Sequence, residues 1–573
     1  MPIAHWHRPQ GVPASNSCEW PSAFAMTIKS QSNYRYGGSE PAMSDANLAS
    51  LLRRQTARLG PRVALRYRRH GLYHDLTWNE YLDRAFAGAA LLIEAGIQPG
   101  DRVGLWSENR LEWLLADLAI LTAGAVNVPA HSTLAPKQVE TQFAHAEINW
   151  LFLASPFQLE QLRPLLGNIP GLKGIVLFDG PAAPNSQDWA SFLVRGQQAL
   201  ARQRGEIDRR LGRITRDDLA TIMYTSGTTG NPKGVMLTHG NLLSNAQSML
   251  IGCGVNENSI LLGWLPLSHI YARLVDHYVH LAAGCTLCLA ESQELLLQNI
   301  AEIQPTSISS VPRFYEKVLA AVGPDRLKSV FGSRIEWLNS GGAPLPLAIA
   351  QAYVDAGLVM LQGYGLTESS PVISFNRRES NRLGTVGQAV PGVEIAIAPD
   401  GEVLTRGPHV MKGYWKDPKA TAEVLRDGWL YTGDLGRLDD DGYLTITGRK
   451  KDLLVLSNGK KVIPSELESL LLAEPCIDQV VITGEGRHFL TALIVPNFEK
   501  LRAALAAEGI REPDNARLVQ HPRAVEFMAK RIDMALSQVA TWEKIQKFVL
   551  LERPFSQEAD ELTVSLKLRR GVI

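Results

Sequence analysis

The chain has 573 residues, of which 45% are hydrophobic and 20% are charged. This composition is typical of a globular protein, and the length favours one large or subdivided domain plus a smaller one. Lys and Arg together number 58, as do Asp and Glu, so no net charge would recruit nucleic acid or an anionic membrane. No apolar run approaches the roughly 20 residues of a membrane span.

The first 42 residues are rich in Pro, Ser, His and Gly and lack the apolar segment of a signal peptide. We expect residues 1–42 to be a disordered extension or the result of a start assigned too early. Five cysteines, an odd and sparse count, indicate a reducing compartment, so we expect a cytoplasmic protein. Cys285 and Cys288 form a C-x-x-C pair in an apolar run, which favours a buried strand over a metal or redox site.

Helical and extended patterns alternate along the first part of the chain. Apolar spacing predicts helices over 46–59, capped by Ser44-Asp45, over 76–95 and over 111–122. Strands are predicted at 63–67, 103–106, 126–128, 148–153, 174–178, 305–311 and 335–338. This alternation indicates an α/β fold with a parallel sheet, and short strands within 394–414 and 443–447 indicate a small β subdomain.

Residues 221–234 read TIMYTSGTTGNPKG, an apolar, strand-prone start followed by small residues. Glycines let the backbone approach a ligand closely and turn N–H groups toward an anion, while hydroxyls and Lys233 add further donors. The composition predicts a phosphate-binding loop rather than a flexible linker, because the segment lies between two apolar stretches. It is not a Walker loop, since Pro232 stands where the second glycine is needed.

This loop resembles the signature of the AMP-forming acyl-adenylating enzymes, which include acyl-CoA synthetases, luciferases and peptide-synthetase adenylation domains. Later segments follow the order of that family: SGGAP at 340–344, QGYGLTE at 362–368, GWLYTGD at 428–434, GRKKD at 448–452 and LTVSLK at 562–567. The segment VPRFYEK at 311–317 and the last motif most resemble long-chain fatty acyl-CoA synthetases. Two features depart from that subfamily. Val564 replaces its usual proline, and a shorter connection replaces its helical insert before residue 340.

The resemblance implies a nucleotide site assembled from these motifs. The residues that it implies for nucleotide binding are Thr225, Ser226, Gly227, Thr228, Thr229, Gly230, Gly342, Ala343, Gln362, Gly363, Tyr364, Gly365, Asp434 and Arg449. Tyr364 would stack on the purine and Asp434 would accept the ribose hydroxyls. Glu368 would hold Mg²⁺, a hard cation that prefers carboxylate and phosphate oxygens.

Three residues are implied as catalytic. Lys233 and Thr367 would contact phosphate, and Lys567 would bridge the attacking carboxylate and the α-phosphate. His269 resembles the family's residue at the entrance of the acyl pocket, although a histidine in an apolar run can equally cap a helix. Lys451 resembles the pivot of a hinge between two closed states.

The resemblance also implies the domain organisation. A large N-terminal domain, residues 43–448, would consist of layered α/β subdomains and a small β subdomain. A small, mobile C-terminal α+β domain, residues 449–573, would carry Lys567. In this second domain we expect a helix that begins at 464, strands at 479–483 and 491–495, and one long helical stretch that ends near 536.

The implied function is ATP-dependent activation of a carboxylic acid, most simply a medium- or long-chain fatty acid, to acyl-AMP and then to acyl-CoA. ATP and Mg²⁺ are the implied cofactors, CoA is the co-substrate, and no nucleic acid partner is expected. Peripheral contact with the inner membrane face and a homodimer are left open. The alternatives are an acyl-AMP ligase that loads a carrier protein, an aryl or short-chain acid CoA ligase, and an inactive nucleotide-binding scaffold. Because no insertion follows the hinge, CoA is favoured over a carrier protein.

Overall fold

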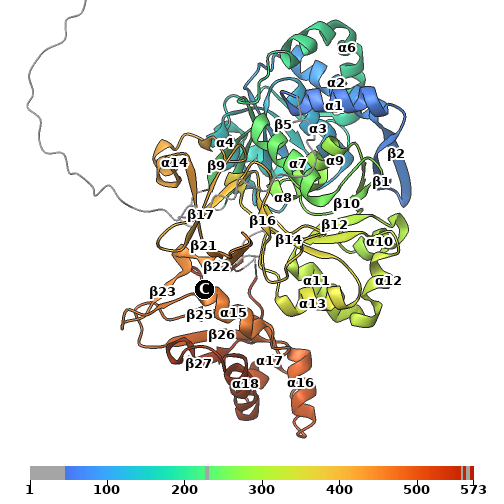
Figure 1. Cartoon of the computed structure of the whole chain (residues 1–573). Helices are drawn as coiled ribbons and strands as arrows, with labels where there is room; N and C mark the ends of the chain where they lie inside the picture. Colours follow the sequence, from blue (N-terminus) through green and yellow to red (C-terminus); the bar gives the residue numbers. More distant parts are fainter. Residues whose placement is uncertain (1–44, 226–231, 557–558, 560, 563–567) are drawn as a thin grey trace, which may run out of the picture.

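The computed structural model describes residues 45–225, 232–556, 559, 561–562 and 568–573 (Figure 1). Its helices are α1 (Leu48–Leu59), α2 (Trp78–Glu94), α3 (Leu111–Thr122), α4 (Pro136–Ala146), α5 (Pro156–Leu162), η1 (Arg163–Asn168), α6 (Trp189–Leu211), α7 (His239–Cys253), α8 (Ile270–Ala272), η2 (Arg273–Tyr278), α9 (Val279–Ala283), α10 (Leu296–Ile303), α11 (Pro312–Val322), η3 (Pro324–Arg326), α12 (Leu327–Phe331), α13 (Leu347–Asp355), η4 (Thr367–Ser369), α14 (Pro418–Val424), η5 (Lys450–Asp452), α15 (Pro464–Leu472), α16 (Phe498–Ala506), α17 (Asn515–Gln520), α18 (Pro522–Ala535) and η6 (Thr541–Glu543). Within the described ranges, no helix has the length and apolar character needed to cross a membrane.

The first large sheet has eight strands in the order β19-β9-β8-β4-β3-β5-β6-β7. The strands are β19 (Gly413–Tyr414), β9 (Lys233–Thr238), β8 (Leu219–Thr225), β4 (Val126–Ala130), β3 (Arg102–Trp106), β5 (Ile148–Leu153), β6 (Gly174–Leu177) and β7 (Gln187–Asp188). Strands β3 to β8 pair in parallel, whereas β8 and β9 form an antiparallel pair. The predicted phosphate loop therefore connects the two strands of a hairpin.

The second large sheet has nine strands in the order β16-β15-β14-β13-β12-β10-β11-β1-β2. They are β16 (Gln388–Ala389), β15 (Val372–Phe375), β14 (Met360–Gly365), β13 (Trp337–Ser340), β12 (Ser307–Ser310), β10 (Ile260–Gly263), β11 (Thr286–Leu289), β1 (Val63–Arg69) and β2 (Leu72–Thr77). The strands from β14 to β1 are parallel. Their carboxyl ends meet at one edge, which is where ligands bind in such sheets.

Helices lie between the two sheets and on their outer faces. The core between the sheets joins Phe86, Leu118 and Leu242 of α2, α3 and α7 to strand residues of both sheets, such as Val103 and Leu287. On their other faces the sheets pack against α4 and against α11 and α13 in separate apolar clusters. Both faces of each parallel region are therefore buried, which is what an α/β sheet requires.

A smaller sheet contains β17 (Glu394–Ile397), β18 (Glu402–Arg406), β20 (Leu425–Arg426), β21 (Trp429–Leu438) and β22 (Leu444–Arg449). Beyond it, β23 (Leu454–Val455) and β24 (Lys461–Val462) form a hairpin. A mixed sheet of β25 (Ile477–Thr483), β26 (Leu490–Pro496) and β27 (Ile545–Leu550) packs with α15 to α18 (Figure 1). The buried residues of the larger apolar cluster in this last part lie between positions 456 and 550, and a smaller cluster includes Val481, Val495 and Phe555.

Several predicted elements are confirmed, and four differ. The helix over 111–122 and the strand over 148–153 match α3 and β5, and the buried strand at Cys288 is β11. The helix predicted from 76 begins at Trp78, because residues 72–77 form β2. Asn47, rather than Ser44-Asp45, caps α1 by accepting from the Ser50 amide at 2.8 Å.

The other two differences concern longer segments. The single long C-terminal helix is wrong, since the chain forms α16, α17 and α18, with Gly509 at φ +83° and Pro522 at the start of α18. The strand at the end of 394–414 is β19, which pairs with β9 of the eight-stranded sheet rather than with the β subdomain.

Candidate nucleotide and acyl site

The adenine-binding segments predicted from the sequence lie side by side at the carboxyl ends of β13 and β14. Ser340 pairs with Gln362 in the parallel register, so the turn 341–343 lies beside residues 363–365. Gly342 has φ +78°, a conformation that favours glycine. At Gly365, an added Cβ would lie 1.7 Å from the Pro371 carbonyl oxygen, so no side chain fits. The backbone conformation at Gly342 and the close packing at Gly365 therefore both favour glycine.

Tyr364, Asp434 and Arg449 are brought together by β14, β21 and β22. The Tyr364 hydroxyl donates to Asp434 Oδ2 at 2.7 Å, and Arg449 Nε forms an ion pair with Asp434 Oδ1 at 2.9 Å. Asp434 and Arg449 are direct cross-strand partners, and Asp434 is only 4% exposed. Burial, together with the Asp434 carboxylate, raises the pKa of Tyr364 far above its ordinary value, so its hydroxyl remains a donor. A buried carboxylate that already binds two donors is well suited to accept ribose hydroxyls.

Lys233 and Glu368 are joined through a residue that the sequence did not identify, Tyr414. The Lys233 ammonium lies 4.9 Å from the centre of the Tyr414 ring, and the Tyr414 hydroxyl donates to Glu368 Oε1 at 2.8 Å. Burial, together with the Glu368 carboxylate, raises the pKa of Tyr414, so this hydroxyl stays protonated. Tyr414 thus fixes the position of one Glu368 oxygen.

Glu368 lies on a pocket of about 210 Å³. The pocket is also lined by Tyr414, Thr432, Arg426 and Lys450, so both charge signs meet there. In the described part of the chain, no group of three or more His, Cys, Asp or Glu could hold a metal ion. One oriented carboxylate nevertheless suits Mg²⁺, which commonly takes one or two protein carboxylates and completes its shell with water and substrate phosphates. Thr367 precedes Glu368 in η4 and lies at the same strand end.

The predicted hinge is connected to the ribose carboxylate by a second unpredicted residue, Glu402. Lys450 donates to Glu402 Oε2 at 2.9 Å and contacts Asp400 at 2.6 Å. The Gly433 amide donates to the other Glu402 oxygen at 2.9 Å. Lys451, the predicted pivot, is exposed in η5. Glu402 therefore connects the hinge to Gly433, the residue that immediately precedes Asp434.

His269 caps α8, because its Nδ1 accepts from the Tyr271 amide at 3.2 Å. The side chain is half-buried. Its position agrees with the helix-cap alternative, and its role in an acyl pocket stays a prediction. Tyr271 itself lies against the adenine-side turn, since a Cβ at Gly341 would come within 2.9 Å of its ring.

Some predicted residues lie outside the described ranges: Ser226, Gly227, Thr228, Thr229, Gly230 and Lys567. Thr225 and Lys233, which flank the loop, are directly opposite each other in the β8–β9 register. The unpredicted residues Tyr414 and Glu402 lie in short strands without a motif of their own. The sequence indicates a strand at Gly413-Tyr414, but it does not indicate that this strand pairs with β9.

Comparison with known proteins identifies the family. The profile of the AMP-binding enzymes matches residues 52–415, and that of the AMP-binding enzyme C-terminal domain matches residues 451–539. The chain belongs to the AMP-binding enzyme family. The long-chain-fatty-acid–CoA ligase FadD15 of Mycobacterium tuberculosis is 33% identical over 561 residues, which cover 88% of this chain and 91% of that protein. The peroxisomal long chain acyl-CoA synthetase 6 of Arabidopsis thaliana is 30% identical over 575 residues, which cover 89% of this chain and 81% of that protein.

Solved structures share the fold. The anthranilate CoA ligase AuaEII in complex with anthranoyl-AMP superposes with a TM-score of 0.76 at 21% identity, covering 92% of this chain and 96% of that one. ATP-bound MatB from Rhodopseudomonas palustris superposes with a TM-score of 0.71 at 25% identity, covering 92% of this chain and 98% of that one. The predicted fold, a large α/β N-terminal domain followed by a small C-terminal domain, is confirmed.

Proposed function

We propose that this protein activates a medium- or long-chain fatty acid with ATP and transfers the acyl group to CoA. In the first step a carboxylate oxygen attacks the α-phosphorus of ATP, and pyrophosphate leaves to give acyl-AMP. In the second, the CoA sulfur attacks the acyl carbonyl carbon, and AMP leaves. The observation that carries the proposal is the convergence of Tyr364–Asp434–Arg449 and Lys233–Tyr414–Glu368 at one segment, residues 364–368. Relatives that are named long-chain acyl-CoA ligases or synthetases support the substrate class.

The barrier to the first step is the approach of two anions, so positioned cations and N–H donors matter more than a strong base. The loop 225–230 and Lys233 would bind the terminal phosphates, and Thr367 would contact phosphate from the other strand end. Mg²⁺ on Glu368 would supply positive charge to the departing pyrophosphate. Lys567 would hold the fatty acid carboxylate against the α-phosphate.

The nucleoside end would be held by the other cluster. Tyr364 would stack on adenine between the turn 341–343 and Gln362, while Asp434 would accept from the ribose hydroxyls and Arg449 would lie beside them. Because Gly342, Gly363 and Gly365 carry no side chains, the purine can approach the backbone at this edge.

Transfer to CoA would require the C-terminal domain, residues 449–573, to rotate about Lys451 and withdraw Lys567. The chain connects the two parts directly, since β22 ends at Arg449 and β23 begins at Leu454. A short connection of this kind supports rotation and hence CoA as the acceptor rather than a carrier protein.

The test measures AMP release from ATP with purified protein, with and without CoA, across straight-chain acids from short to long and several aryl acids. We expect CoA-dependent AMP release that is greatest with medium or long chains. AMP release that requires a carrier protein, or that is greatest with aryl acids, would contradict the proposal. Binding of ATP without AMP release from any acid would indicate an inactive scaffold.

A further inference from the structure

An ion pair outside the hinge joins the large N-terminal domain to the small C-terminal domain. Arg313 Nη2 donates to Asp478 Oδ1 at 3.1 Å, across 165 positions of the chain. Both side chains are partly exposed, and Arg313 also contacts Glu316, one turn further along its helix, at 3.2 Å. Arg313 belongs to the segment 311–317 that resembles long-chain fatty acyl-CoA synthetases, and the nucleotide site described above does not include it.

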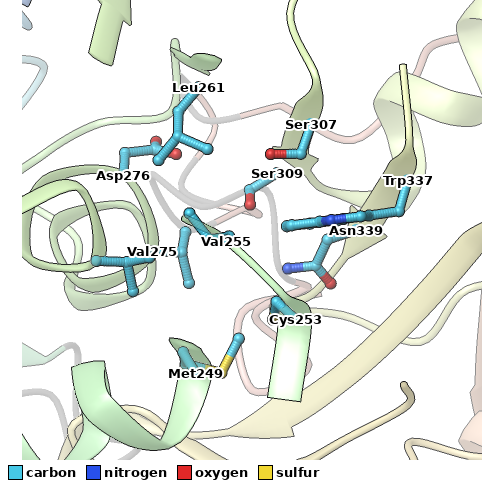
Figure 2. Close-up of a pocket in the computed structure, with 11 residues that line it drawn as sticks. Met249, Cys253, Val255, Leu261, Val275, Asp276, Ser307, Ser309, Trp337 and Asn339 are labelled. Atoms are coloured by element: carbon cyan, nitrogen blue, oxygen red, sulfur yellow. The ribbon is translucent and has the colours of Figure 1, made fainter. Parts of the chain in front are cut away.

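Arg313 lies on a rigid part of the large domain. It is the second residue of α11, which begins at the carboxyl end of β12, beside the turn 341–343. The Tyr315 hydroxyl donates to the Asn339 carbonyl of β13 at 2.7 Å, and Tyr353 of α13 donates to the Tyr315 carbonyl at 2.9 Å. Behind these strands, side chains of α7, η2, β12 and β13 enclose only about 10 Å³, the volume of about one water molecule (Figure 2). The guanidinium is therefore presented from a closely packed core.

Asp478 lies beside the end of the chain. It is the second residue of β25, and the next residue, Gln479, accepts from the Phe555 amide at 2.7 Å. Phe555 is buried against β25 and β26 in an apolar cluster that also includes Leu562 and Leu568. The strand that binds the large domain through Asp478 therefore supports the chain on both sides of the predicted catalytic lysine.

A second connection places this part of the chain near the boundary between the domains. Arg570 forms an ion pair with Glu468 of α15. Ser465 of the same helix donates to the Thr447 carbonyl of β22 at 3.2 Å, and β22 also carries Arg449 of the ribose site. Figure 1 marks the last residue of the chain beside this boundary. In this orientation the C-terminal segment lies close to the nucleotide site, as acyl-AMP formation would require.

We propose that the Arg313–Asp478 ion pair is a latch that holds the C-terminal domain in the orientation for acyl-AMP formation. Both are then positioning residues for this half-reaction. Their role rests on the proposed function, in which the C-terminal domain rotates before transfer to CoA. Rotation separates the two charges, because Arg313 stays with the large domain and Asp478 moves with the small one. The pair therefore stabilises one orientation and not the other, which shifts their populations.

The strength of the pair sets how far its loss can shift the two half-reactions. Exposed ion pairs change an equilibrium constant by about 1.5- to 5-fold. When rotation is faster than the chemistry, the rate of each half-reaction is proportional to the population of its own orientation. The ratio of acyl-AMP formation to thioester formation then changes by the full factor, whatever the starting populations are. A general loss of stability lowers both rates together and leaves this ratio unchanged.

The test measures both half-reactions in single turnovers with dodecanoic acid, or with the acid found most active in the test above. Pyrophosphate release from ATP and the acid, without CoA, reports acyl-AMP formation. AMP release from the supplied acyl-AMP and CoA reports transfer. In Asp478→Asn and in Arg313→Gln, we expect the ratio of the first rate to the second to fall by about two- to fivefold. Asp478→Arg places two like charges together and should lower the ratio further.

Three controls separate the latch from other effects. The double variant Arg313→Gln/Asp478→Asn should show the same ratio as either single variant, because the same pair is lost in all three. Arg378→Gln should keep the wild-type ratio, because Arg378 forms a similarly exposed ion pair with Glu336, at 2.7 Å, within the large domain. Salt at about 1 M, where the screening length is about 3 Å, should lower the ratio more in the wild type than in the double variant.

Three outcomes would overturn the latch: an unchanged ratio in both single variants, an equal loss of both half-reactions, or a double variant whose effect is the product of the single effects. If the wild type performs both half-reactions and the ratio does not respond, only the latch fails. If the wild type forms acyl-AMP from no acid, the proposed function fails and the latch fails with it.

Discussion

Tyr414 provides the sharpest test of the phosphate side of the site, because one hydroxyl contacts the proposed metal carboxylate. In Tyr414→Phe the ring remains beside Lys233, so the contact between the ammonium and the aromatic ring is preserved. Only the hydrogen bond to Glu368 Oε1, 2.8 Å long, is removed. The substitution therefore separates the orientation of Glu368 from the position of Lys233.

The expected magnitude follows from the charge of the acceptor. A hydrogen bond to a charged group contributes about 1.5–3 kcal/mol, and each 1.4 kcal/mol corresponds to a factor of ten. Tyr414 is largely buried, so water can replace the lost donor only in part. Loss of a partner of this kind typically weakens metal binding or activity by about 10- to 100-fold. We expect the Mg²⁺ concentration for half-maximal acyl-AMP formation to rise by about that factor.

The assay is a Mg²⁺ titration of fatty-acid-dependent pyrophosphate release at saturating ATP and acid. Tyr431→Phe is the matched control, because Tyr431 lines the same pocket while its ring packs on Arg426, 4.6 Å away. In the control, the Mg²⁺ concentration for half-maximal activity should equal that of the wild type. In Glu368→Gln, this concentration should rise more than in Tyr414→Phe. If Tyr414→Phe titrates like the wild type, Tyr414 does not orient the metal carboxylate and the reasoning is refuted.

Three further predictions concern other parts of the chain. Lys567→Ala should abolish acyl-AMP formation yet leave thioester formation from supplied acyl-AMP largely intact; equal loss of both half-reactions would exclude the proposed role. Burial alone would raise the pKa of Asp117, but Arg273 and its neighbours hold it at about 2, below the unfolded value. Its stabilising contribution is therefore complete above the unfolded pKa and is lost as the pH falls toward 2. Asp117→Asn should lower the free energy of unfolding at pH 7 by about 3–5 kcal/mol, measured by urea denaturation, and a change below 1 kcal/mol would contradict the buried pair. Asp478→Asn removes an exposed ion pair of 3.1 Å between β25 and Arg313, so the melting temperature should hardly change, whereas small-angle scattering should report an altered position of the C-terminal domain. Identical scattering profiles would show that this pair does not hold the domain.

The sequence allowed prediction of those parts of the site that lie within contiguous motifs. Tyr364 lies one residue before the end of β14, whereas Asp434 lies inside the ten-residue strand β21. Their motifs could be placed in one site through the order that they share with the family, because that order requires no knowledge of strand pairing. The antiparallel register that sets Arg449 opposite Asp434 could not be derived from the sequence.

The remaining parts depend on pairing between distant segments. Tyr414 reaches Glu368 because β19 pairs with β9, whose residues lie nearly 180 positions earlier in the chain. A two-residue strand carries no pattern that identifies its partner.

We expect the contacts of Arg449 to link nucleotide binding to the hinge. Asp434 binds Tyr364 through one oxygen and Arg449 through the other, and each oxygen keeps a lone pair that could accept from a ribose hydroxyl. Arg449 is the last residue of β22, and the next residue, Lys450, binds Glu402, which also accepts from the Gly433 amide beside Asp434. A ribose that shifts Arg449 would therefore act on the hinge along one peptide, and the hinge would act on Asp434 through Glu402. Nucleotide occupancy and the position of the C-terminal domain would then be thermodynamically coupled, and each would change the free energy of the other by the same amount.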